Sequence, residues 1–127
     1  MVQEMTSKER KYGTIIADKV YFIKQLDSLG IDKNYTGYFM LVDIESMLVN
    51  QKDRVFSFSK EIYPIVAKKY NKAEFTVERN IRNLIDKCWT MELMEKLNHY
   101  LPDGQKPTCR DFIYMIKNFI IYQLFKN

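Results

Sequence analysis

The residues best suited to chemistry in this sequence lie close together, between Thr76 and Arg82. Arg79 and Arg82 are three residues apart, so on a helix they point to one side, with Thr76 one turn earlier and Glu78 beside them. In the major groove of DNA, an arginine fork binds guanine O6 and N7, and a carboxylate accepts a hydrogen bond from cytosine N4. The spacing therefore predicts that Arg79 and Arg82 face base edges together, with Thr76 and Glu78 next to them.

Lysines surround this cluster in the sequence. Lys68 and Lys69 lie near the end of the preceding predicted helix, and Lys72 lies in the turn that follows it. Lysine ammonium groups bind phosphate oxygens and so fix the position of a protein on a duplex. We expect these three lysines, together with Lys106, to contact the DNA backbone.

The net charge of +4 is concentrated in residues 52–87, which hold nine basic and five acidic residues, whereas the rest of the chain holds eleven of each. Such asymmetry favours a polyanionic partner, most often nucleic acid. The alternative is a solvated lysine-rich surface, on which Arg82 pairs with Glu78 or Asp86, four residues away on either side.

Catalytic and metal-binding patterns are missing from the sequence. The one histidine, His99, and the two cysteines, Cys88 and Cys109, lie too far apart to indicate a metal site. No GxGxxG, P-loop or GxSxG motif occurs, and Glu92 and Glu95 have the spacing of a solvated helix surface. We therefore expect no enzyme, no cofactor and no metal, and free thiols in a reducing cytosol.

Apolar residues recur at three- and four-residue steps, which predicts an all-α fold of about six helices in one compact domain over residues 1–127. After a polar tail, residues 1–13, the first helix runs from near Lys8 or Thr14 to Leu29. Its apolar stripe is Ile16, Val20, Ile23 and Leu26. The second helix runs from about Tyr35 to Asn50, with an opposite face that we expect to be polar. Its apolar stripe is Tyr38, Leu41, Ile44 and Leu48.

Residues 57–89 predict a helix-turn-helix. The first helix covers residues 57–71, and Pro64 must either kink it or lie near its start, close to Ile62. A turn at residues 70–72 leads to a second, amphipathic helix that extends to Trp89. Its expected buried side consists of Val77, Ile81, Leu84, Ile85 and Cys88.

Two more helical segments complete the chain, residues 91–101 and the segment after Pro107. Thr108 can cap the last helix, with Asp111 three residues on and Phe112 within reach of Pro107. The last helix is apolar nearly all round, which indicates deep burial or a partner protein. No stretch has the length of a signal peptide or a membrane span, so we expect a cytoplasmic protein without membrane contact.

Several motifs follow one another in a specific order: Gly37-Tyr38, Tyr63-Pro64, Ala67-Lys68-Lys69, Val77-Glu78-Arg79, Ile81-Arg82, Trp89 and Lys106-Pro107-Thr108. Together they resemble the C-terminal effector domain of the stage zero sporulation protein A family, from about Ile15 to Lys117. The resemblance implies an all-helical bacterial DNA-binding domain that reads a short GC-containing box, often as tandem copies bound by two protomers. The base-reading positions of the family fall on Thr76, Glu78, Arg79 and Arg82.

The sequence departs from this family at three places. The family usually has arginine at the position of Thr76, which changes the base preference expected at one edge of the box. The family normally carries an N-terminal phosphoacceptor domain, so we expect a stand-alone effector domain without its own phosphorylation switch. The segment between Trp89 and Pro107 is several residues shorter, which weighs against the RNA polymerase sigma factor contact ascribed to that region.

Two functions of different classes follow. The leading hypothesis is a sequence-specific transcription regulator that binds double-stranded DNA, with a homodimer on tandem sites. The alternative is a protein-interaction module that pairs with or antagonises another regulator without reading DNA, using its apolar last helix. A salt titration separates the two, because DNA binding weakens steeply as salt rises and an apolar interface does not.

Overall fold

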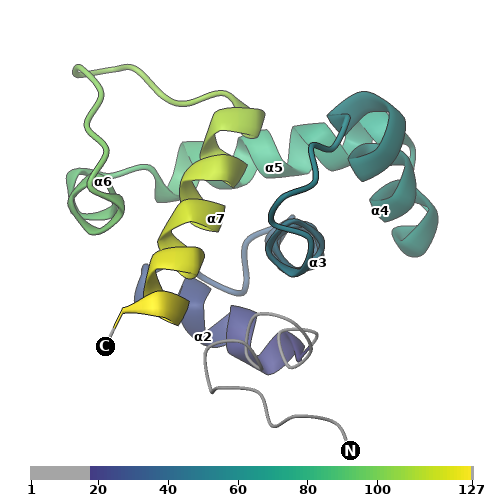
Figure 1. Ribbon diagram of the computed structural model, residues 1–127. Coiled ribbons are helices and arrows are strands. Elements are labelled where there is room, and N and C mark those ends of the chain that lie inside the picture. The colour runs from purple at the N-terminus through teal and green to yellow at the C-terminus, as the bar shows by residue number, and fades with distance from the viewer. Residues whose placement is uncertain (1–17, 127) are drawn as a thin grey trace, which may run out of the picture.

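The computed structural model describes residues 18–126, and in this range six α-helices and one short π-helix share a core and no strand occurs (Figure 1). The π-helix η2 (Phe58–Ile62) leads directly into α4. The α-helices are α2 (Lys19–Ser28), α3 (Tyr38–Asn50), α4 (Tyr63–Tyr70), α5 (Glu74–Cys88), α6 (Met91–Leu97) and α7 (Cys109–Phe125). The predicted all-α fold is confirmed, whereas the polar tail and the start of the first predicted helix lie outside the described residues.

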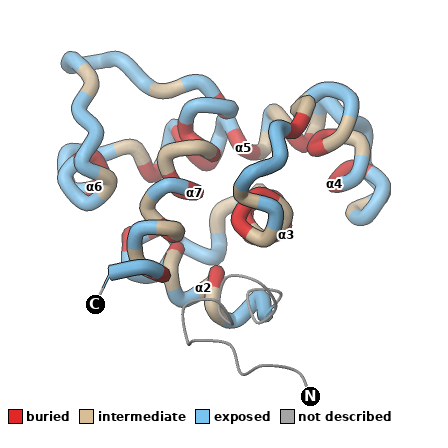
Figure 2. The backbone as a smooth tube through the Cα atoms, viewed as in Figure 1, coloured by how far each residue is buried: buried red, intermediate tan, exposed pale blue. Residues whose placement is uncertain are grey.

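The central helix is α3, around which α2, α4, α5 and α7 pack (Figures 1 and 2). Its predicted apolar stripe is fully buried. The predicted polar opposite face is present, because this face carries Asp43, Ser46 and Asn50, together with Phe39, which is 50% exposed. The flanks of the helix are buried as well, Glu45 among them, because four helices pack around α3.

Glu45 is a carboxylic acid in the middle of this core. Its side chain is fully buried, and neither carboxylate oxygen has a hydrogen-bond partner within residues 18–126. Burial raises the pKa of Glu45 well above its ordinary value, against the opposing charge of Lys117 on α7. Lys117 is buried too, and its Nζ donates to the Lys52 carbonyl oxygen at 3.0 Å. The fold therefore favours the protonated form of Glu45.

Gly37 determines where α3 begins and how close it comes to α5. The helix starts at Tyr38 rather than near Tyr35, and Gly37 before it has a φ of 94°, in the left-handed region that favours glycine. A Cβ atom at this position would lie 2.8 Å from the carbonyl oxygen of Asn80 in α5. The absence of a side chain thus permits the contact between these two helices.

The apolar stripe predicted for the first helix is wrong in part. Val20 is 53% exposed and Ile23 only half-buried, whereas Phe22 and Leu26 are fully buried. Phe22 and Leu26 are four residues apart, so they define one face of α2, and the large aromatic ring takes the core position. Ile16, the first member of the stripe, lies outside the described residues.

Pro64 lies in the first turn of α4, the part of an α-helix that best tolerates a residue without an amide hydrogen. The chain before it forms η2, whose first turn is capped by the side chain of Ser57, which accepts from the amide of Lys60 at 3.2 Å. The start of α4 at Tyr63 agrees with the prediction that the helix begins close to Ile62.

In the C-terminal third of the chain, α6 is shorter than predicted, whereas α7 begins at the predicted cap. Asn98 adopts a left-handed conformation with a φ of 54°, so α6 ends at Leu97, before the predicted limit. The predicted cap of α7 is confirmed, because Thr108 Oγ1 accepts from the amide of Asp111 at 3.1 Å. No helix within the described range is long and apolar enough to cross a membrane.

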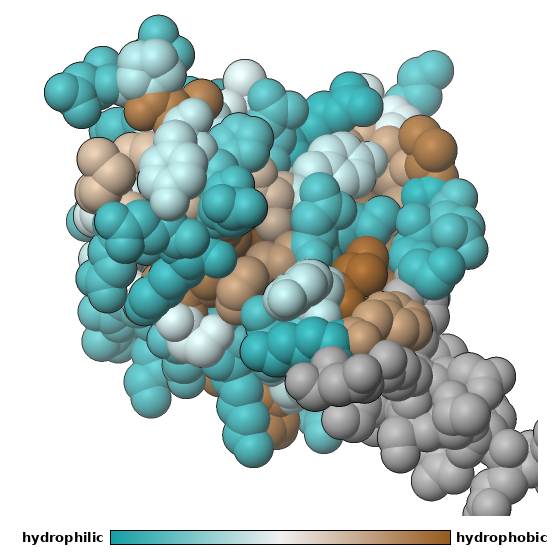
Figure 3. Space-filling view, turned by 60° about the vertical axis from the view of Figure 1, so that its left-hand side comes forward, coloured by the Kyte–Doolittle hydropathy of each residue, from teal (hydrophilic) through white to brown (hydrophobic). Residues whose placement is uncertain are grey.

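Burial accounts for most of the apolar surface of α7. One side of the helix belongs to the core, whereas Tyr122 and Phe125 stay 64% and 39% exposed. On the face shown in Figure 3, with the α6 side of Figure 1 turned forward, hydrophilic side chains surround smaller hydrophobic areas. The buried residues of α7 are Cys109, Phe112, Ile113, Ile116, Lys117, Ile120 and Leu124.

Candidate nucleic-acid interface

The helices α4 and α5 are joined by a short turn at residues 71–73, one residue later than predicted. Asn71 adopts a left-handed conformation with a φ of 54°. The amides of Asn71 and Lys72 donate back to the carbonyl oxygens of Lys68 and Ala67 at 3.3 and 2.9 Å, and so satisfy the end of α4. Ala73 is extended and begins α5. The pair has the sequence order of a helix-turn-helix.

The two sides of α5 differ sharply in burial. The five residues predicted for its hidden side are all buried, which confirms the expected rotation of the helix: Val77, Ile81, Leu84, Ile85 and Cys88. Arg79 and Arg82 are exposed on the other side, and Thr76 and Glu78 are half-buried at its edges. The core contacts of α5 therefore leave both guanidinium groups accessible to solvent.

Each of the two arginines has a different neighbour. The guanidinium carbon of Arg79 lies 5.5 Å from the ring centre of Phe75, a cation–π arrangement. Arg82 forms an ion pair of 3.0 Å with Glu78, so one of the surface pairs weighed as an alternative to DNA binding is present. Both partners of this pair are about half exposed, at 56% and 45%, and a pair so open to water contributes little to stability. Because water already competes for this pair, Arg82 can exchange it for another acceptor at little cost.

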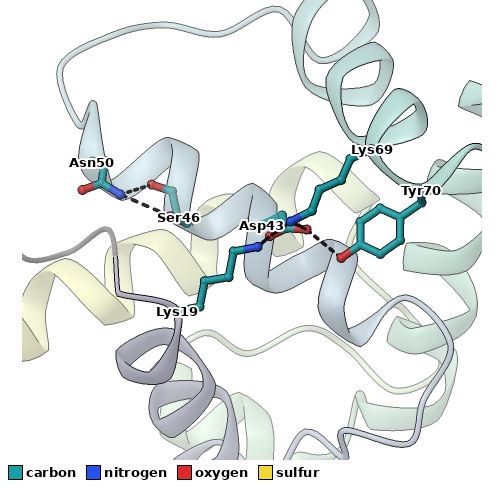
Figure 4. A network of polar contacts seen from close by, with 6 residues as sticks. All are labelled: Lys19, Asp43, Ser46, Asn50, Lys69 and Tyr70. Carbon is teal, nitrogen blue, oxygen red and sulfur yellow. Dashed lines mark hydrogen bonds and ion pairs between the residues drawn. The ribbon is translucent and has the colours of Figure 1, made fainter.

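Lys69 belongs to a polar network around Asp43 of α3 (Figure 4). Its Nζ donates to Asp43 Oδ1 at 2.9 Å, the hydroxyl of Tyr70 donates to Oδ2 at 2.6 Å, and Lys19 lies 2.5 Å from the same carboxylate. Burial raises the pKa of Asp43, but the hydrogen bonds from Lys19, Tyr70 and Lys69 outweigh burial and hold the pKa below its ordinary value. The network ties the end of α4 to α3.

The other three predicted phosphate contacts are all exposed. Lys106 donates to Asp86 Oδ1 at 3.2 Å, so Asp86 pairs with Lys106 rather than with Arg82. Lys68 and Lys72, at the end of α4 and in the turn, form no ion pair with any residue in the described part of the chain. These two lysines are therefore the most accessible cations beside α5.

A hollow runs along α5 next to Arg79, and sequence reasoning missed the part of its lining that comes from the loop before α3. Tyr35 and Thr36, from the loop before α3, face Arg79, Asn83 and Lys87 of α5 across it. The ammonium group of Lys87 lies 5.9 Å from the ring centre of Tyr35. The two segments are far apart in the sequence and meet because Gly37 lets α3 start against α5. The Gly37-Tyr38 motif was the one local signal of this contact.

A family model described as sporulation initiation factor Spo0A C terminal matches residues 22–120, most of the chain. The chain belongs to this family. This is a family of DNA-binding effector domains, which supports a DNA-binding regulator in general. The matched range includes all of α4 and α5, the turn between them and most of α7.

Cysteine and histidine, the two kinds of side chain best suited to nucleophilic or metal chemistry, lie elsewhere in the sequence, outside residues 76–82. Cys88 and Cys109 are free and buried. Burial raises the pKa of the Cys88 thiol to about 12 and also raises that of Cys109, which disfavours a thiolate at either position. His99 is exposed just after α6. Within residues 18–126, no group of three or more His, Cys, Asp or Glu side chains could hold a metal ion.

Proposed function

We propose that this Spo0A C-terminal domain is a sequence-specific transcription regulator that places α5 in the major groove of double-stranded DNA. One observation carries the proposal: α5 is anchored by a completely buried apolar side and presents Arg79 and Arg82 to solvent on the opposite side. The second helix of a helix-turn-helix reads bases from such an exposed side. Family membership supports DNA binding in general.

The four predicted base readers differ in how ready they are for this role. Arg79 and Arg82 have the reach and the fork geometry for guanine O6 and N7. Arg82 must leave Glu78 first, and this exchange frees the Glu78 carboxylate to accept from cytosine N4. Thr76 is half-buried and offers a hydroxyl, which discriminates between bases less well than an arginine does.

Among the lysines, Lys68 and Lys72 are proposed as the primary phosphate contacts because they have no competing carboxylate within the described residues. Lys69 and Lys106 must exchange Asp43 and Asp86 for phosphate. Such contacts hold the protein on any sequence, so Lys68→Ala should weaken binding to all duplexes alike and reduce the salt slope by about one contact.

Selection of bound sequences from random duplex DNA, followed by fluorescence anisotropy on the selected site, tests the proposal. Arg79→Ala and Arg82→Ala should each weaken specific binding by ~1–3 kcal/mol with an unchanged circular dichroism spectrum. Lys24→Ala is the matched control, because Lys24 is an exposed cation on α2, away from the helix-turn-helix. If Lys24→Ala lost as much DNA affinity as the arginine variants, binding would depend on net charge alone, which would contradict the proposal.

We further propose that two protomers bind tandem copies of the box. Titration of duplexes that carry one or two boxes, with the bound mass read by analytical ultracentrifugation, measures the stoichiometry. One protomer on one box and two on the tandem duplex are expected. A single protomer on both duplexes would contradict this part of the proposal.

A further inference from the structure

The first turn of α5 carries a large apolar side chain on the same side as the arginines. Phe75, the second residue of the helix, is 66% exposed, in contrast to the buried side of α5. This turn contains Glu74, Phe75 and Thr76 and no basic residue. It therefore lacks an arginine fork for guanine, and its most prominent group is an aromatic ring.

The ring of Phe75 is also held in place by the helix itself. Arg79 lies one turn later, with its guanidinium carbon 5.5 Å from the ring centre. A cation over an aromatic ring attracts it and limits the positions of both side chains. Phe75 and Arg79 consequently form one unit, and a base contacted by Phe75 must neighbour the base contacted by Arg79.

DNA offers one apolar group in the major groove, the C5-methyl group of thymine, and an exposed phenyl ring is suited to pack against it. The residues near the N-terminus of a recognition helix are the ones that come closest to base edges. We infer that Phe75 is a specificity-determining residue, which reads the methyl group of a thymine next to the guanine bound by Arg79. The inference rests on the proposed function and adds a base preference to it.

Replacement of thymine by deoxyuridine isolates the methyl group, because uracil keeps every hydrogen-bonding atom of thymine and lacks only that group. We would replace each thymine of the selected site in turn and measure binding by fluorescence anisotropy. For the wild-type protein, one position next to an Arg79-dependent guanine should lose about three- to fivefold in affinity, the effect of one buried methyl group. Phe75→Ala should bind the two duplexes equally well, and Phe75→Leu should keep part of the difference.

The outcomes separate this inference from the proposed function. Sequence-selective binding without any methyl-sensitive position in the wild type would overturn the inference and leave the proposed function intact. Methyl sensitivity that persists in Phe75→Ala would also overturn it. Failure of the wild type to select any duplex would contradict the proposed function and the inference together. The exposure of Phe75 leads us to expect native circular dichroism for both variants.

Discussion

Truncation of Ile81 tests whether the rotation of α5, and with it the exposure of the arginines, is set by the core. Ile81 is fully buried in the cluster that also contains Val66 of α4 and Phe112 of α7. Ile81→Ala removes three carbon atoms, each worth about 0.8 kcal/mol of transfer free energy, or about 2.4 kcal/mol. Incomplete relaxation around the cavity brings the expected loss of unfolding free energy to ~3–4 kcal/mol.

Urea denaturation followed by circular dichroism measures this loss, with Asn83→Ala as the control on the same helix. Asn83 is exposed, so its truncation should change the unfolding free energy by at most ~0.5 kcal/mol. DNA affinity of Ile81→Ala should fall only with the folded fraction. If Ile81→Ala unfolded like the wild type while Arg79→Ala unfolded early, α5 would be rotated the other way and the assignment of its base-reading side would be refuted.

Three further predictions concern backbone strain and buried charge. Gly37→Ala should cost ~1–3 kcal/mol of stability, because φ is 94° and a Cβ would meet a carbonyl oxygen of α5 at 2.8 Å. Thermal denaturation should show a smaller loss for the control Gly30→Ala. Gly30 has a φ of 79°, but a Cβ there would have no atom nearer than 3.9 Å. Because the pKa of Glu45 is higher in the folded state, folding takes up a proton between the unfolded-state and folded-state pKa values. The stability that Glu45 contributes is therefore greatest below the ordinary glutamate pKa and is lost as pH rises through the folded-state pKa. Urea denaturation across pH should show that Glu45→Gln removes this decline. The pKa of Asp43 is lowered in the folded state, so its effect on stability runs in the opposite direction with pH. The stability that Asp43 contributes above its ordinary pKa is lost as pH falls through the folded-state pKa. Acid denaturation of Asp43→Asn should lack this loss.

The amphipathic pattern of α5 could be read from the sequence because it is local. Five apolar residues at helical spacing identify its buried side whatever packs against them, and the exposed side follows by exclusion. The cap at Thr108 and the early position of Pro64 in α4 are local signals of the same kind. Each depends on neighbours within one helical turn.

The features that the sequence did not predict depend on contacts between distant segments. The pattern of α3 has one strong apolar stripe, and nothing in it shows that four helices pack around it and also bury its flanks with Glu45. The stripe of α2 was misplaced towards Val20, because the neighbouring helix, and not the spacing alone, decides which apolar residues face inward. The contact between Tyr35 and Lys87 of α5 was not predicted for the same reason.

The network at Asp43 shows why such long-range contacts matter for DNA binding. Phosphate can attract Lys69 only in competition with a buried carboxylate, whose loss of a partner would be costly if it were left alone. Lys19 and Tyr70 remain on Asp43 when Lys69 departs, so the carboxylate keeps a cation and a hydrogen-bond donor. The exchange would therefore leave no isolated buried charge, yet it would gain less than the phosphate contact proposed for Lys68, which has no ion pair within residues 18–126 to give up. The position of a lysine beside a recognition helix thus does not determine its contribution, which depends on the ion pair that it must give up.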